Sequence, residues 1–190
     1  ASAQHIAQST AFNASDRGLN VMPLFHIHGL IAGILAPLSQ GGEVHCTGGF
    51  NALKFFAQMD EVKPTWYTAV PTMHQAILSR AANNKDVIAR VPLRFIRSSS
   101  SSLPPQVLAE LEATFHAPVI EAYGMTETSG VVLSQRNDAV RYGTVGGPVP
   151  GVEVRVSEVG ELQVRGPVVF QGYYRNPEAT ADTIVDGWLH

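Results

Sequence analysis

Residues 118–130 bring together side chains that could hold a nucleotide and its metal ion. The apolar stretch 119–122 predicts a short buried strand, and in an open α/β sheet ligands bind beyond the carboxyl ends of such strands. An aromatic ring, Tyr123, follows the strand, and then a hydroxyl beside a carboxylate, Thr126 and Glu127. The ring could stack on a base, and Mg²⁺ prefers carboxylate and phosphate oxygens. Each residue alone fits an ordinary strand and polar loop, but the ordered set favours a nucleotide site.

The same run resembles the Y-G-x-T-E core motif of the adenylate-forming superfamily, which includes acyl- and aryl-CoA synthetases, luciferase and nonribosomal-peptide adenylation domains. Residues 160–166 and 172–180 resemble its G-E-L-x-V-x-G and G-Y-x-x-x-P-x-x-T signature. Residues 23–30 are similar to the P-x-F-H-x-x-G segment of its acyl-CoA ligases. The resemblance implies a two-step reaction. A carboxylate attacks the α-phosphorus of ATP and releases pyrophosphate, and a thiol, usually that of coenzyme A, then displaces AMP.

The resemblance also implies roles for individual residues. Tyr123 would stack on adenine, and the backbone of Glu121 and Ala122 would meet the edge of that base. Thr126 would contact the α-phosphate, and Glu127 would ligate a Mg²⁺ ion that bridges the phosphates. The residues expected to bind ATP or AMP are Ser100, Ser101, Glu121, Ala122, Tyr123, Gly124 and Thr126.

His26 is the next candidate for chemistry, because it follows a predicted strand, 19–24, and a phenylalanine. The resemblance places it beside the carboxylate channel, and with Thr126 and Glu127 it completes the expected catalytic set. A histidine can donate a hydrogen bond to an anion whether it is neutral or charged. A partly buried histidine satisfied by backbone is the alternative. His28 could cap a helix or face the substrate pocket, and we favour the structural role. No further His or Cys ligands at suitable spacing accompany the two histidines to make a metal site.

Five consecutive serines, 98–102, follow another predicted strand, 93–97. Small side chains there would let the backbone approach the adenine and acyl groups, although a flexible polar loop is the alternative. Together with Arg97, whose direction the sequence leaves open, the run suits a short polar acid better than a long alkyl chain. Residues 65–74 and 97–103 look most like the oxalate-CoA ligase subgroup, near the 4-coumarate-CoA ligases. The residues expected to bind the acid are His26, Arg97, Ser99, Gly124 and Met125.

Composition narrows the classes of partner and compartment. The net charge of −3 gives no excess of basic side chains for binding nucleic acid. No apolar run reaches the length needed for stable membrane insertion. The single cysteine, Cys46, excludes an internal disulfide. We therefore expect a reducing compartment, the cytoplasm, or a peroxisome in a eukaryote. Cys46 ends the alternating run 43–46, which predicts a buried strand thiol.

Strands and helices alternate through the first two-thirds of the chain, which predicts an α/β fold with a parallel sheet flanked by helices on both faces. The expected strands are 19–24, 43–46, 65–70, 93–97 and 119–122. After the Gly/Pro run 146–151 the apolar period changes to two, which predicts a hairpin turning near 158–160. We therefore divide the chain into an α/β unit, 1–147, and the start of a β-rich unit, 148–190.

Several parts of the family are missing from the sequence. It contains no phosphate loop of the T-S-G-T-T-G-x-P-K type, no ribose-binding aspartate after the last motif and no lysine-bearing C-terminal domain. We therefore expect an internal segment, inactive alone, of a ligase that uses ATP, Mg²⁺, coenzyme A and a short diacid such as oxalate.

A peptide-type adenylation domain is the nearest alternative. Such domains usually have an aspartate at the position of His26, so the histidine favours an acyl or aryl acid. A luciferase-like oxygenase and a non-catalytic nucleotide-binding or structural fragment remain alternatives. An α/β hydrolase is disfavoured because no G-x-S-x-G motif is present.

Overall fold

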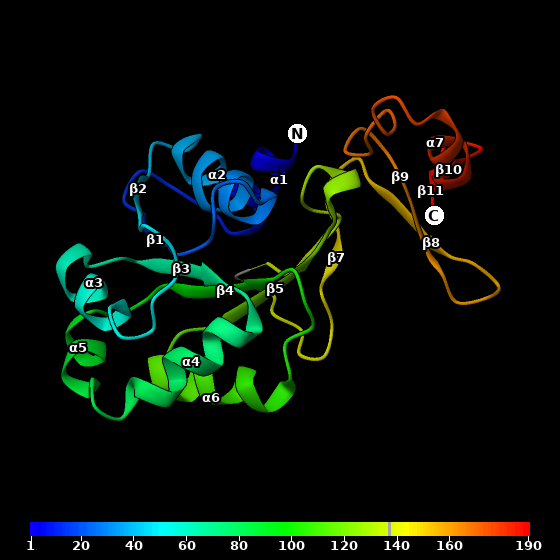
Figure 1. Ribbon diagram of the computed structural model, residues 1–190. Helices are drawn as coiled ribbons and strands as arrows, with labels where there is room; N and C mark the ends of the chain where they lie inside the picture. Colours follow the sequence, from blue (N-terminus) through cyan, green and yellow to red (C-terminus); the bar gives the residue numbers. More distant parts are fainter. Residues whose placement is uncertain (137) are drawn as a thin grey trace.

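The computed structural model describes residues 1–136 and 138–190 and contains two β-sheets (Figure 1). The larger sheet has seven strands in the order β2-β1-β3-β4-β5-β6-β7. Strands β2, β1, β3, β4 and β5 are parallel, and β6 and β7 extend the sheet in antiparallel fashion. The strands are β1 (Arg17–Asn20), β2 (Glu43–Cys46), β3 (Trp66–Ala69), β4 (Phe95–Ser99), β5 (Val119–Tyr123), β6 (Leu133–Ser134) and β7 (Gly147–Pro148).

Helices cover both faces of this sheet, as the alternating pattern predicts (Figure 1). One face carries α1 (Ser2–Ser9), the π-helix η1 (His28–Leu35) and α2 (Ala36–Leu38), and the other carries α3 (Phe55–Val62), α4 (Pro71–Ala81), α5 (Lys85–Arg90) and α6 (Pro105–Phe115). Side chains alternate along each strand, so that each face has its own apolar core. Trp66 and Phe95 stack in the first core, and Tyr67 and Ile96 lie in the second. The predicted fold class is confirmed.

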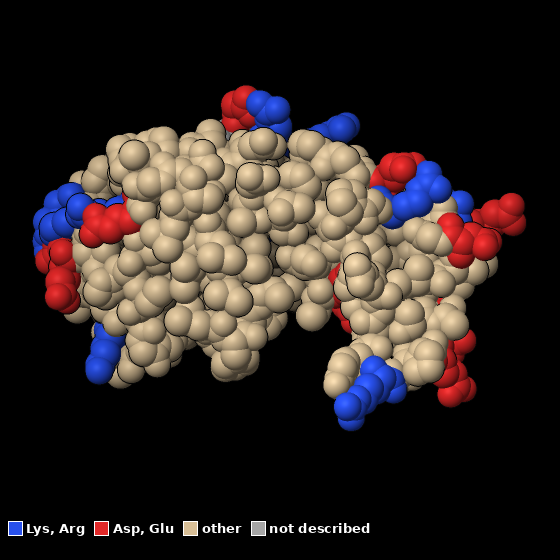
Figure 2. All heavy atoms as spheres, turned by 90° about the horizontal axis from the view of Figure 1, so that it is seen from above, with Lys and Arg blue, Asp and Glu red and all other residues tan. Residues whose placement is uncertain are grey.

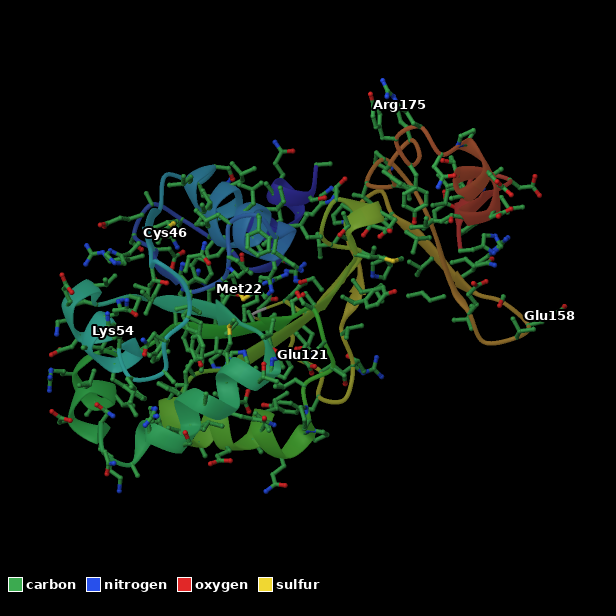
Figure 3. All side chains as sticks on the ribbon, viewed as in Figure 1. Met22, Cys46, Lys54, Glu121, Glu158 and Arg175 are labelled. Atoms are coloured by element: carbon green, nitrogen blue, oxygen red, sulfur yellow. The ribbon has the colours of Figure 1, made fainter. Side chains whose placement is uncertain are left out.

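The second sheet is antiparallel and has the order β10-β11-β9-β8. Its strands are β8 (Glu153–Val156), β9 (Leu162–Arg165), β10 (Ile184–Val185) and β11 (Trp188–Leu189), and α7 (Pro177–Thr183) precedes β10. The predicted hairpin is β8–β9, with Glu158 in its connecting turn (Figure 3). The predicted division at 147/148 falls inside β7, a strand of the larger sheet, and the second sheet starts at Glu153. The division itself stays a prediction.

A buried carboxylate ties together the amino ends of three parallel strands. Asp16 is 2% exposed, and both of its oxygens accept hydrogen bonds from the Arg94 guanidinium, at 2.9 and 2.6 Å. The Thr65 hydroxyl donates to Asp16 at 3.0 Å, and the Arg17 N–H donates to that hydroxyl at 2.9 Å. Arg17, Thr65 and Arg94 stand at or just before the starts of β1, β3 and β4. The carboxylate therefore aligns these strands from their amino ends.

Three expectations about individual elements need correction or addition. The strand predicted at 19–24 is Arg17–Asn20, because the Asn20 side chain accepts a hydrogen bond from the Met22 N–H and turns the chain out of the sheet. The thiol of Cys46 is exposed rather than buried, because β2 is an edge strand with one neighbour (Figure 3). The short helices α5 and α7 are not among the elements expected from the sequence.

Charged side chains of both signs lie around the rim and over the C-terminal part, whereas the broad middle of the face in Figure 2 carries few. None of the helices formed by the described residues has both the length and the apolar content needed to cross a membrane. The compartment stays a prediction.

We expect the stability of the chain to fall as the pH drops from about 6.5 toward 4, because of His74. This side chain is 0% exposed, its Nδ1 lies 3.2 Å from the Tyr67 hydroxyl, and burial lowers its pKa to about 4. The unfolded chain therefore binds a proton at a pH where the folded chain does not. The linkage corresponds to about 3 kcal/mol, present in full above pH 6.5 and lost on acidification.

Urea unfolding of the wild type and of His74→Asn between pH 7 and pH 4.5 measures this effect. The variant is expected to show a clearly shallower decline, and His45→Asn, which changes an exposed histidine, serves as the matched control. Identical pH slopes for the wild type and His74→Asn would contradict the assignment.

Candidate functional site

The parallel strands end along one edge of the larger sheet, and a row of paired residues crosses the strands from the end of β1 to β5. The register places Asn20 of β1 beside Thr68 of β3, Thr68 beside Arg97 of β4, and Arg97 beside Ile120 of β5. Residues paired across a parallel ladder project on the same side of the sheet. The row therefore lies on the face covered by η1, and the predicted site residues follow it in the loops beyond.

The loop after β1 carries His26 and His28. The Asn20 side-chain amide donates to the Gly29 carbonyl at 3.1 Å, which holds the start of η1 against the end of the strand. The half-buried His26 accepts a hydrogen bond at Nδ1 from the His28 N–H at 3.1 Å. The two rings lie 6.4 Å apart, centroid to centroid. His26 is thus at the predicted edge, six residues beyond the strand end.

His28 is buried, and its ring contacts a hydroxyl on β3 and a hydroxyl in the loop after β4. Its Nε2 lies 2.6 Å from the Thr68 hydroxyl, and its Nδ1 lies 3.0 Å from the Ser100 hydroxyl. Because the Thr68 hydroxyl donates to the Arg97 carbonyl, Nε2 must carry the proton and Nδ1 must accept from Ser100. Burial, followed by the positive charge of Arg97, holds the pKa of His28 well below its usual range. The imidazole is therefore neutral at physiological pH.

Arg97 points inward and is 2% exposed. Burial lowers the pKa of its guanidinium to about 10, so that the group still carries its charge at neutral pH. Within the described part of the chain, its Nε and Nη1 have no hydrogen-bond partner. A buried charge without a partner is energetically costly, and proteins normally supply an opposite charge or a ligand at such a position. The sequence had left the direction of this side chain open.

The serine run is partly used by the fold itself. Ser99 is buried, and its hydroxyl donates to the carbonyl of Ala122 at 3.0 Å, which ties β4 to β5 at their carboxyl ends. Ser100 and Ser101 are exposed in the loop, and Ser100 has a left-handed backbone with φ of 74°. Small polar residues thus occupy the carboxyl end of β4 and the loop that follows it.

The strand end at Tyr123 turns sharply through Gly124. A Cβ atom at this glycine would collide with the carbonyl oxygen of Gly130, so the closeness of two backbone segments already requires a glycine here. Met125 and Thr128 are joined by reciprocal hydrogen bonds between the Thr128 hydroxyl and the Met125 backbone, at 2.9 and 3.1 Å. The turn is therefore rigid. It presents the half-buried ring of Tyr123 and the exposed side chain of Thr126.

Glu127 lies in the 3₁₀ turn η2 (Thr126–Thr128), close to the C-terminal unit. The Tyr173 hydroxyl donates to its Oε1 at 2.9 Å, and the Phe170 N–H donates to its backbone carbonyl at 2.7 Å. Among the described residues no cluster of three or more His, Cys, Asp or Glu side chains could hold a metal ion by itself. A single carboxylate fits Mg²⁺ delivered with a nucleotide, since such ions are held by one or two carboxylates plus substrate phosphates.

A pocket of about 330 Å³ lies beside the Glu121 side chain, on the α6 side of the sheet (Figure 3). Leu103, Leu108 and Tyr142 contribute to its walls, and the Tyr142 hydroxyl donates to Glu112 of α6 at 2.9 Å. Burial raises the pKa of Glu121 above its ordinary value. The pocket is lined mostly by apolar residues together with the carboxyl groups of Glu112 and Glu121, which suits a flat ring that carries an amino group.

The predicted residues therefore fall into three neighbouring groups along one edge. His26, Ser100 and Arg97 gather around His28; Ser99, Ala122 and Glu121 mark the ends of β4 and β5; Gly124, Met125, Thr126 and Glu127 form the turn after Tyr123. Sequence reasoning missed His28 as a member of the site, and it missed Thr68 and Tyr173. The H-x-H spacing and the tyrosine of the G-Y signature were the available signals, but neither shows which strand or which carboxylate the side chain contacts.

Residues 1–174 match the AMP-binding enzyme family. The chain belongs to this family. It is 43% identical to an oxalate–CoA ligase of Arabidopsis thaliana, over 93% of the chain and 37% of that protein. It is 34% identical to a sulfoacetate–CoA ligase of Cupriavidus necator, over 100% of the chain and 39% of that protein. The chain thus spans less than two-fifths of the length of these relatives.

The fold is similar to that of a malonyl-CoA ligase solved with methylmalonyl-CoA and AMP bound. The TM-score is 0.88 at 35% identity, and the alignment covers 99% of this chain and 43% of the other. A second solved relative, an anthranilate CoA ligase in complex with anthranoyl-AMP, has a TM-score of 0.87 at 23% identity and supports the fold alone. The α/β architecture of this AMP-binding chain is therefore that of acid–CoA ligases.

We expect Gly124→Ala to destabilise the chain by about 1–3 kcal/mol, the range for overpacking a well-packed site. The added methyl group meets backbone atoms, which cannot rotate away as a flexible side chain could. Urea unfolding measures the loss. Gly48→Ala is the matched control because nothing lies within 4 Å of a Cβ there. Equal losses for the two variants would argue against the close approach of Gly124 and Gly130.

Proposed function

We propose that this chain forms the central part of an ATP-dependent acid–CoA ligase that acts on a short dicarboxylic acid, with oxalate as the favoured substrate. The family membership and the names of the relatives support the ligase class. The observation that carries the choice of acid is the buried guanidinium of Arg97, whose Nε and Nη1 have no hydrogen-bond partner among the described residues. A second carboxylate on the substrate would supply the missing opposite charge, and an alkyl chain would leave the charge unpaired.

The reaction has two steps. One carboxylate oxygen of the acid attacks the α-phosphorus of ATP, pyrophosphate leaves, and an acyl-adenylate forms. The thiol of coenzyme A then attacks the acyl carbon, loses its proton, and displaces AMP. Both reactants of the first step are anions, so the protein must orient them and offset their repulsion.

Each group of residues has a part in this proposal. Arg97 binds the distal carboxylate, and the neutral His28 keeps the Ser100 hydroxyl and the end of β3 in place around it. His26 donates a hydrogen bond beside the reacting carboxylate. Glu127 would hold Mg²⁺, which when bound neutralises phosphate charge. This assignment rests on the motif resemblance and on the position of these residues at one edge of the sheet.

The nucleotide would lie along the ends of β4 and β5. Tyr123 stacks on adenine, and Ser100 and Ser101 allow the backbone to approach it. The buried carboxyl of Glu121 lies in a pocket suited to a ring that carries an amino group, so it accepts from the adenine amine. Thr126, exposed on the rigid turn, contacts the α-phosphate.

Arg97→Met is expected to lower the preference for a diacid in the whole protein. Hydrogen bonds to charged groups contribute about 1.5–3 kcal/mol, so kcat/KM for oxalate should fall by about 10- to 150-fold. AMP release with oxalate, malonate and decanoate measures the change, and decanoate turnover should not fall in parallel. Arg90→Met, which changes a surface arginine, is the matched control. A wild-type preference for long alkyl acids would refute the diacid assignment.

A peptide-type adenylation domain and a non-catalytic nucleotide-binding segment are the competing functions. The first would activate an amino acid, and no carboxylate occupies the His26 position to hold its ammonium group. The second would bind ATP or AMP and release no AMP in the whole protein. AMP release measured with the same acids and with amino acids distinguishes these two functions from the proposed acid–CoA ligase.

The 190-residue chain by itself is expected to show no carboxylate-dependent exchange of pyrophosphate into ATP, because the sequence contains no phosphate loop of the family type. Titration of the same chain with AMP measures how much of the nucleotide site it retains. Robust exchange by this chain would contradict the proposed location of the missing groups.

A further inference from the structure

Glu127 is held by hydrogen bonds from a distant part of the chain. The Tyr173 hydroxyl donates to Oε1 at 2.9 Å, and the Phe170 N–H donates to the Glu127 carbonyl at 2.7 Å. The rings of Phe170 and Tyr173 pack edge to face with centroids 4.8 Å apart. The segment that carries the last family signature therefore contacts both the backbone and the carboxylate of Glu127.

The position of the Tyr173 hydroxyl is fixed by its own surroundings. The Tyr173 N–H donates to the Thr180 hydroxyl at 2.9 Å, and that hydroxyl donates to the Asn176 carbonyl at 2.8 Å. The Asn176 side chain in turn caps α7 by accepting from the Ala179 N–H at 3.1 Å. The turn before α7 is thus pinned to the helix, and it presents the tyrosine toward η2.

The backbone of Glu127 is equally constrained on its own side. The reciprocal bonds between Met125 and Thr128 close the 3₁₀ turn around it. The fixed backbone does not by itself set the side-chain torsions of Glu127, and the Tyr173 hydroxyl bonds to its Oε1. Groups behind a metal-binding carboxylate commonly set its orientation and contribute to metal affinity.

We propose that Tyr173 is a positioning residue whose hydroxyl orients the Glu127 carboxylate for the divalent cation that accompanies ATP. The inference rests on the proposed function of Glu127. It also makes the C-terminal unit part of the metal site, since α7 places the hydroxyl. A tyrosine at this position thereby links the packing of residues 170–180 to nucleotide binding.

Binding of Mn²⁺ to the whole protein in the presence of ATP, followed by electron paramagnetic resonance, tests the proposal without turnover. Tyr173→Phe is expected to raise the Mn²⁺ dissociation constant about tenfold, the lower end of the effect for residues behind metal ligands. The half-saturating Mg²⁺ concentration for AMP release should rise in parallel, and kcat at saturating Mg²⁺ should change little. Tyr174→Phe is the matched control, because Tyr174 is 85% exposed and adjacent.

A double-mutant cycle with Glu127→Gln tests whether Tyr173→Phe acts on the orientation of the Glu127 carboxylate or loosens the surrounding structure in general. In the Glu127→Gln background, Tyr173→Phe should have no further effect on Mn²⁺ affinity, whereas independent effects would overturn the proposal. Unchanged Mn²⁺ affinity in Tyr173→Phe, with an active wild type, would overturn this inference and leave the proposed function intact. A wild type that binds no Mn²⁺ with ATP and releases no AMP with any acid would refute both.

Discussion

The carboxylate of Asp16 sets the register on which the candidate site depends. It lies at the amino ends of β1, β3 and β4, buried and bonded to Arg94 and Thr65. Because a strand is a nearly rigid rod with a fixed rise per residue, alignment at one end determines which residues stand side by side at the other. In strands this short, a slip of one residue would move Thr68 and Arg97 to the opposite face of the sheet. The paired Asp16 is therefore a condition for the polar row under η1.

Arg97 of the polar row is buried, and so are His28 and His74. The pKa of His28 is lowered first by burial and then by the charges of Arg97, His26 and His74, and the pKa of His74 is lowered by burial. The two histidines respond by staying neutral. Arg97 cannot do so at neutral pH, and it keeps its charge. Among the described residues, this region therefore holds a buried positive charge without an opposite charge beside it. An anionic ligand would supply that opposite charge.

The part of the chain that carries the larger sheet contacts the part that carries the smaller sheet at the turn that holds Glu127. The larger sheet supplies the 3₁₀ turn, and the segment before α7 supplies the hydroxyl and N–H that bond to it. In the smaller sheet, the guanidinium groups of Arg155 and Arg165 lie over the Trp188 ring, at 4.1 and 4.5 Å from its centroid. These cation–π contacts join β11 to the β8–β9 hairpin. The smaller sheet is therefore held together by side-chain contacts as well as by its strand pairing.

The sequence by itself determined the fold class, most strand positions and the family. Apolar periods of about 3.6 and 2 identify helices and strands because burial imposes those periods, and three motifs in order identify the adenylate-forming superfamily. The end of β1 was predicted too late, since the turn depends on a side-chain bond of Asn20 that propensity does not show. The exposure of Cys46 follows from β2 being an edge strand, which is a property of strand order.

Only the tertiary structure decided which side chains face one another. Register and packing between distant segments determine that Arg97 points inward. They also determine that His28 bonds to Thr68 and Ser100, and that Tyr173 reaches Glu127. Local sequence encodes the alternation of side chains but not the phase of that alternation relative to a neighbouring strand. That phase is fixed by long-range contacts, which exist only once the chain has folded.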